Sequence, residues 1–143
     1  MLVEPHRSAA KAKGFRELIW AGDIVQAPYS GLGVMERVIR GKPDQVRRMV
    51  RALYRAFRLV KADREHSVAF MMREWKVSRE VAERTYDTEI KAYTVDGTAV
   101  DEVIQEGLRF AREGGWKIPE NLPSSRIVDW SFLGAVHRET AGR

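Results

Sequence analysis

The stretch from Pro43 to Ala62 constrains the fold more than any other part of the chain. Its apolar residues recur at steps of three and four, which predicts one amphipathic helix. Pro43 suits a first helical turn, and Asp44 lies where the positive end of the helix dipole favours a carboxylate. About twenty residues at 1.5 Å each make a rod of roughly 30 Å, long enough for the spine of a small domain.

The two sides of this predicted helix differ in character. The apolar stripe consists of Val46, Met49, Val50, Leu53, Phe57 and Val60. The opposite side carries Arg47, Arg48, Arg51, Arg55 and Arg58. Such a pattern is typical of a helix that packs by one face, and packing alone indicates no function.

Helical periodicity continues after the spine. Asp63 and Ser78 are good N-caps, so we expect helices from Asp63 to about Lys76 and from Arg79 to about Tyr93. Further helices are expected over Ser8–Lys13, Val100–Glu113 and Ser124–Glu139, with a short helical turn over Met35–Arg40. The helix from Asp63 is expected to place Val68, Ala69, Met72 and Trp75 inward. The helix from Ser124 is expected to bury Ile127, Trp130, Leu133 and Val136.

Extended segments are expected only near the N-terminus. Leu2-Val3 precedes Glu4-Pro5, and a residue before proline is pushed toward extended backbone. A second short strand is predicted over Phe15–Trp20. The predicted class is α-rich α/β, with one or two short strands near the N-terminus followed by four to five helices.

Composition excludes several classes of protein. A chain of 143 residues can bury one good core, and its 44% hydrophobic and 31% charged content is that of an ordinary globular protein. The absence of cysteine excludes disulfides, thiolate nucleophiles and cysteine zinc sites. The net charge of +5 invites a nucleic-acid interpretation. The arginines alternate with Glu and Asp on helix faces, so nucleic acid is not the first choice of partner.

No targeting segment is evident. No apolar run approaches the roughly 18 residues that cross a bilayer, and residues 1–15 do not have the pattern of a secretion signal. We therefore expect a cytoplasmic protein if Met1 is the natural start.

We find no catalytic constellation in the sequence. The three histidines, His6, His66 and His137, are far apart and lack metal-ligand spacing. Asp87 and Glu89 do not share a helix face, so they are not an acid–base couple. The glycines at positions 31 and 33 lack the Lys-Ser/Thr of a phosphate loop. We expect no enzyme activity, no metal site and no cofactor.

Several motifs together resemble a known family. They are PYSGLGV at 28–34, P-x-x-V-R-R-x-x-R-A from Pro43, E-x-x-V-A-x-x-x-x-x-W from Glu65, and V-D-W-S from Val128. In this order and spacing they are similar to the C-terminal half of ABC-transporter substrate-binding proteins. The closest group includes the alkanesulfonate, taurine and thiamine-pyrimidine binders.

The resemblance implies the C-terminal part of a periplasmic-binding-protein-like II fold. That family has a two-lobed α/β clamshell about twice this length, with ligand held between the lobes. Residues 1–143 would then be a single partial domain, either a natural truncation or an excised fragment. Its segments would be the end of the second lobe with the crossing segment (1–34) and a helical C-terminal region (35–143). As part of a full-length exported protein, it would be periplasmic.

The resemblance also implies a function and a site. The chain would be the solute-binding component, or a truncated remnant, of an ABC import system. It would work with an ABC permease and bind a small-molecule solute weakly or not at all on its own, and which solute stays open. The ligand-binding residues implied are Glu4, His6, Tyr29, Ser30 and Gly31. The alternative is a small helical interaction protein that uses the arginine face, with nucleic acid as one possible partner.

The apolar stripe has a further consequence on this interpretation. Helices that pack on a missing sheet keep their apolar faces, and exposed patches of several hundred Å² are uncommon on soluble monomers. We therefore expect a homo-oligomer that buries more than ~1,000 Å² of surface.

Overall fold

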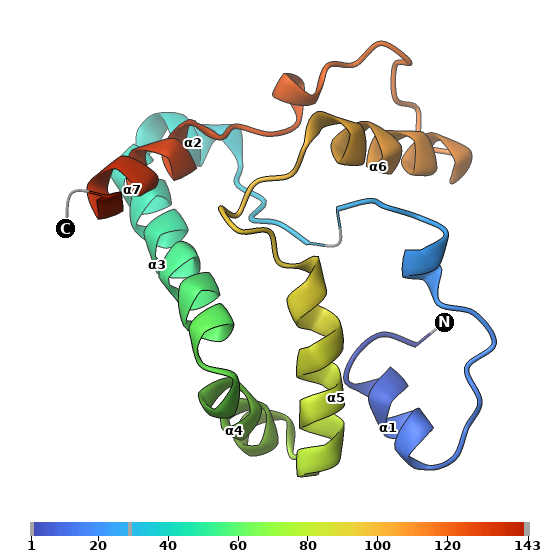
Figure 1. Cartoon of the computed structure of the whole chain (residues 1–143). Coiled ribbons are helices and arrows are strands. Elements are labelled where there is room, and N and C mark those ends of the chain that lie inside the picture. Colours follow the sequence, from blue (N-terminus) through green and yellow to red (C-terminus); the bar gives the residue numbers. More distant parts are fainter. Residues whose placement is uncertain (1, 29, 142–143) are drawn as a thin grey trace. The chain divides into compact units, whose positions relative to one another are not determined.

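The computed structural model describes residues 2–28 and 30–141, and the regular secondary structure in this part of the chain is all helical (Figure 1). Helix accounts for 64% of the structure, and the described residues form no strand. The α-helices in this range are α1 (His6–Ala12), α2 (Glu36–Gly41), α3 (Pro43–Ala62), α4 (Arg64–Trp75), α5 (Arg79–Glu89), α6 (Asp101–Glu113) and α7 (Ser131–Ala141). Three 3₁₀ turns accompany them: η1 (Ala21–Asp23), η2 (Ile90–Ala92) and η3 (Ser124–Arg126).

The predicted α/β class is wrong, and with it the predicted C-terminal part of a periplasmic-binding-protein-like II fold, because neither expected strand forms. A strand needs a neighbouring strand for its ladder hydrogen bonds, and the backbone groups here bond to a helix end instead. The Val3 carbonyl accepts from the Arg7 N–H at 3.0 Å, and the Phe15 N–H donates to the Ala10 carbonyl at 3.1 Å. These bonds close the two ends of α1, and residues 16–20 continue as irregular chain.

Local signals for helix ends are confirmed where a cap was predicted. The spine spans Pro43–Ala62, as the sequence indicates. An Asp63 carboxylate oxygen accepts from the His66 backbone N–H at 2.9 Å. The Ser78 hydroxyl oxygen accepts from the Val81 N–H at 3.3 Å. Each cap pairs one of the backbone donors that a helix N-terminus leaves free.

The last predicted helix is wrong in its first half. Only a 3₁₀ turn forms at Ser124–Arg126, and α7 begins at Ser131. An Asp129 carboxylate oxygen accepts from the Ser131 N–H at 2.8 Å. An Asp side chain that pairs with backbone in this way ends extended chain and starts a helix, which the apolar periodicity did not reveal.

The chain divides into two compact units, and the boundary falls within α3. Unit 1 consists of Met1–Trp20 and Ala56–Thr94, and unit 2 consists of Ala21–Arg55 and Val95–Arg143.

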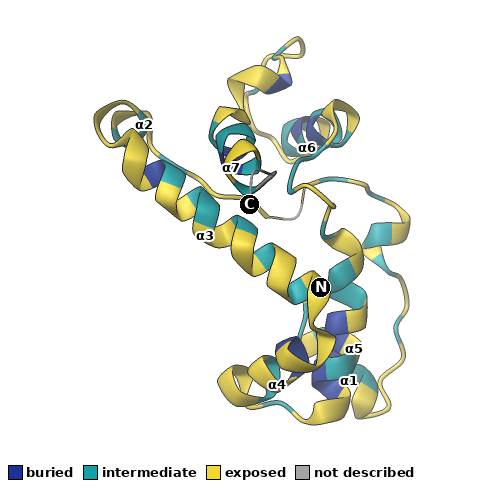
Figure 2. Cartoon of the chain, turned by 60° about the vertical axis from the view of Figure 1, so that its left-hand side comes forward, coloured by how far each residue is buried: buried dark blue, intermediate teal, exposed yellow. Residues whose placement is uncertain are grey.

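In unit 1, α1 and α4 pack against α5. The buried cluster consists of Val68, Ala82 and Tyr86, and the Tyr86 hydroxyl donates to the Val60 carbonyl at 2.7 Å. Of the face of α4 that the sequence places inward, Val68 is buried, whereas Trp75 is exposed. The core of unit 1 is therefore centred on α5, the helix with the most buried residues (Figure 2).

In unit 2, Ile104 and Leu108 of α6 and Leu133 and Val136 of α7 are buried. Gly107 allows a close approach of residue 28 to α6, because an added Cβ would lie 3.0 Å from the proline Cδ. Two contacts join α7 to α3. The rings of Tyr54 and His137 lie 4.7 Å apart, and the Arg51 Nη2 donates to a Glu139 oxygen at 2.6 Å.

Most of the predicted apolar stripe of α3 is not buried. Within unit 2, Val46 is buried and Val50 is half-buried, whereas Met49 is 49% and Leu53 is 37% exposed. Figure 2 shows α3 as largely exposed along its length. The helix thus keeps apolar side chains in contact with water.

Candidate functional site

Glu4, the first of the predicted ligand-binding residues, is bonded within unit 1. Its side chain is only 3% exposed. The carboxylate accepts from the Arg7 Nη1 at 2.9 Å, the Ser8 backbone N–H at 3.1 Å and the Thr85 hydroxyl at 3.3 Å. Its oxygens are thus used by the chain itself, and they connect α1 to α5.

Arg7 is the centre of this group, which we call the Arg7 cluster (Glu4, Arg7, Glu17, Trp20 and Thr85). The guanidinium donates from Nε and Nη2 to the two oxygens of Glu17, at 2.5 and 2.9 Å. It also lies over the Trp20 ring, 4.1 Å from the centroid. A guanidinium held by two carboxylates and an aromatic face is a strong structural contact.

Within the Arg7 cluster, the hydrogen bonds favour the charged forms of Arg7 and Glu17. Hydrogen bonds from Arg7 and then Lys11 lower the pKa of Glu17 to about 2. Because this folded-state pKa lies below the ordinary value of 4.5, Glu17 stabilises the fold at neutral pH. That contribution is lost as the pH falls toward 2. Nearby, burial raises the pKa of Glu89, and the negative charge of Glu4 adds to the effect.

The remaining predicted residues are distributed over both units. His6 is exposed in the first turn of α1. Ser30 and Gly31 are exposed and belong to unit 2, and Tyr29 lies outside the described residues. Within unit 1 the structure brings Glu4 and His6 to the start of one helix, and the Glu4 carboxylate is already fully bonded there.

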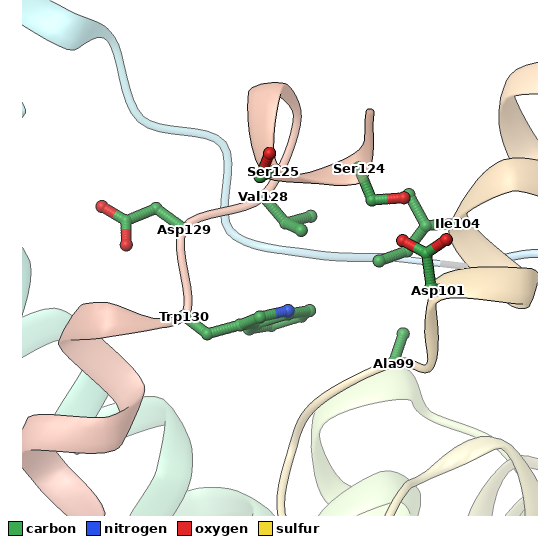
Figure 3. Close-up of a pocket in the computed structure, with 8 residues that line it drawn as sticks. All are labelled: Ala99, Asp101, Ile104, Ser124, Ser125, Val128, Asp129 and Trp130. Carbon is green, nitrogen blue, oxygen red and sulfur yellow. The ribbon is translucent and has the colours of Figure 1, made fainter. Parts of the chain in front are cut away.

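Unit 2 contains a pocket of about 460 Å³ that the sequence did not predict. It lies between the N-terminal part of α6, the 3₁₀ turn η3 and the chain that leads into α7 (Figure 3). Its lining consists of Ala99, Asp101, Ile104, Ser124, Ser125, Val128, Asp129 and Trp130. Its lining mixes apolar and polar side chains, and the pocket is open to solvent, since Asp101, Ser125, Asp129 and Trp130 are exposed.

The side chains that face the pocket come from two segments. Figure 3 shows the Trp130 ring extending toward α6, where the Asp101 carboxylate and Ile104 lie. The Ser124 hydroxyl is fixed by the Gln105 Nε2, which donates to it at 2.9 Å. The pocket therefore has an aromatic wall, a carboxylate and an oriented hydroxyl.

The second carboxylate of the lining has another role. Figure 3 shows Asp129 directed away from the Trp130 ring. Hydrogen bonds from the hydroxyl and then the backbone N–H of Ser131 lower the pKa of Asp129. Asp129 is thus the cap of α7, and Asp101 is the carboxylate that faces the cavity.

Sequence reasoning missed this pocket for a specific reason. The periodicity predicts Trp130 on the buried face of a helix from Ser124, but it lies on irregular chain before α7 and is 40% exposed. The available signal was Asp129 itself, because an Asp side chain that accepts from the backbone N–H two residues later forms a turn that can precede a helix.

Comparisons with known proteins found no relative. No family matches the chain, and neither a curated protein nor a solved structure matches it. Over residues 2–28 and 30–141, no group of three or more His, Asp or Glu side chains is placed to hold a metal ion. None of the helices described here combines the length and apolarity that crossing a membrane requires.

Proposed function

We propose that the chain is a non-enzymatic solute-binding module of an ABC import system. The observation that carries the proposal is the pocket of about 460 Å³ in unit 2. Its volume suits a small molecule, and its lining combines apolar side chains with a carboxylate and hydroxyls, as binding pockets do.

The motif order in the sequence supports the same proposal. The Pro-initiated motif begins α3, the motif from Glu65 ends with Trp75 at the end of α4, and V-D-W-S leads into α7. An ABC permease is the partner that the resemblance implies. Because the pocket is open on one side, we expect millimolar affinity in the isolated chain.

This proposal is tested by amide NMR titration with three solutes: methanesulfonate (anionic), uracil (neutral) and choline chloride (cationic). We expect at least one of them to shift the signals of Ile104, Val128 and Trp130 in a saturable way. The Trp130→Ala variant should lose the shifts, because the aromatic wall is removed. Trp116→Ala is the matched control, since Trp116 is exposed in the same unit and does not line the pocket. If none of the three solutes gives clustered shifts, the proposal is wrong.

A second candidate function is favoured by the basic face of α3. Arg48 and Arg55 lie two turns apart on one side of the helix and are exposed. No ion pair or hydrogen bond to either guanidinium occurs within the described part of the chain, whereas Arg47 and Arg51 are paired with Asp44 and Glu139. Unpaired arginines at this spacing are suited to contact the phosphates of a nucleic acid.

The second candidate predicts salt-dependent retention on duplex DNA. A plot of log affinity against log salt concentration has a negative slope. Replacing Arg48 and Arg55 by Gln should reduce the magnitude of this slope by about 1.8, since each phosphate contact contributes about 0.9. The matched control replaces Arg79 and Arg84, which are paired with Glu residues on the surface of unit 1. An unchanged slope, or no retention at low salt, excludes this function.

A further inference from the structure

The pocket of unit 2 is negative in a chain that is positive. The chain carries a net charge of +5. None of the residues that line the pocket is Lys, Arg or His, and of the two Asp residues in the lining, Asp101 directs its carboxylate into the cavity. A local field of this sign attracts cations and repels anions.

The Asp101 carboxylate is free to pair with a ligand. It occupies the first turn of α6 and is exposed. Among the residues that the structure describes, no side chain forms an ion pair with it or donates a hydrogen bond to it. A carboxylate that faces a cavity without a partner loses hydration when a neutral solute fills the cavity, and this disfavours neutral ligands. A cationic solute replaces the lost hydration with an ion pair.

Trp130 adds a second attraction for cations. Its ring extends into the pocket toward the Asp101 carboxylate and is 40% exposed. The face of an indole ring attracts a cation within about 6 Å of its centroid, and Trp is the best of the aromatic residues for this contact. Ile104 and Val128 complete the lining with apolar surface that suits methyl or methylene groups.

We infer that the pocket binds an organic ammonium ion, a small cation whose charged nitrogen carries apolar groups. The nitrogen lies between the Trp130 ring and the Asp101 carboxylate, and the apolar groups contact Ile104 and Val128. This inference rests on the proposed solute-binding function and names the class of its ligand.

The test compares two probes of equal shape. Choline chloride is titrated against 3,3-dimethylbutan-1-ol, in which carbon replaces the charged nitrogen. The readout is the indole Nε1–H signal of Trp130 in NMR, assigned by its loss in Trp130→Phe. We expect choline to shift this signal with at least fivefold higher affinity than the neutral alcohol.

A variant without the Asp101 charge tests whether this carboxylate causes the preference for choline. Asp101→Asn should weaken choline binding about fivefold or more, and it should not weaken binding of the alcohol, because the desolvation cost of the carboxylate is removed. The matched control is Glu102→Gln, which removes a negative charge from the same turn of α6. Glu102 does not line the pocket. It should change choline affinity less than twofold.

Three outcomes would overturn the inference. They are equal affinities for choline and the alcohol, equal effects of the two charge variants, or a shift of all four indole signals together. Binding of methanesulfonate or uracil in the pocket without choline would reject the cationic ligand but leave solute binding intact. Absence of any solute from the pocket would reject both.

Discussion

In light scattering at micromolar concentration, we expect the chain to have at least twice the mass of its 16.4 kDa monomer. The reason is the amount of surface that the fold leaves exposed. The chain exposes 10790 Å². Two separate globules of about half the chain's mass each would together expose about 9,000 Å². The excess of roughly 1,800 Å² per chain is more than the ~800 Å² that each partner buries in a standard interface.

The exposed edge of α3 is where we expect the second copy to bind. Met49 and Leu53 lie one turn apart on it. Replacing both by Glu should raise the dissociation constant of the dimer more than tenfold, because two carboxylates would be buried without partners. Sedimentation velocity over a range of concentrations measures this change.

A control on the same helix separates this site from a general effect of charge. Leu59 is also exposed on α3, but it lies outside the apolar stripe. Leu59→Glu should leave the dissociation constant within about twofold. A stable monomer at 100 micromolar, or an equal response to Leu59→Glu, would show that α3 is not the interface.

The second large effect is expected at Glu4. Glu4→Ala should destabilise unit 1 by about 2–4 kcal/mol, because it leaves a buried donor of Thr85 and the Ser8 N–H without their acceptor. The contact between α1 and α5 depends on this carboxylate. Hydrogen exchange of the α1 amides is the measurement, and we expect their protection to fall by at least tenfold.

Glu80→Ala is the matched control for Glu4→Ala. Glu80 is an exposed carboxylate on α5 that pairs with Arg84 one turn along the helix. Exposed pairs of this kind contribute at most about 0.5 kcal/mol. If the two variants give the same exchange rates in α1, Glu4 does not hold that helix to unit 1.

Much of the helical structure could be predicted from local sequence. The bounds of α3 and the caps at Asp63 and Ser78 follow from interactions within one turn, which neighbouring residues decide. The start of α7 was missed even though its cap is also local, because the periodicity of Ile127 and Trp130 favoured a longer helix. Competition between two local signals is settled by packing, which the sequence does not display.

The failed predictions near the N-terminus depend on which partners the backbone and side chains find, and these partners are both local and distant. A strand exists only where another segment pairs with it, and the chain near Val3 and Phe15 bonds to α1 instead. Glu4 was predicted to bind ligand, but the hydroxyl of Thr85 and the guanidinium of Arg7 occupy it.

The sequence by itself thus determined the amphipathic helices and their caps, because each hydrogen bond of a helix joins residues four positions apart. The sequence by itself did not determine the pocket of unit 2. It exists because the N-terminal part of α6 and the segment before α7 lie together, more than twenty residues apart along the chain. Only the folded chain decides which side chains share a cavity, and so only it places Asp101 beside Trp130.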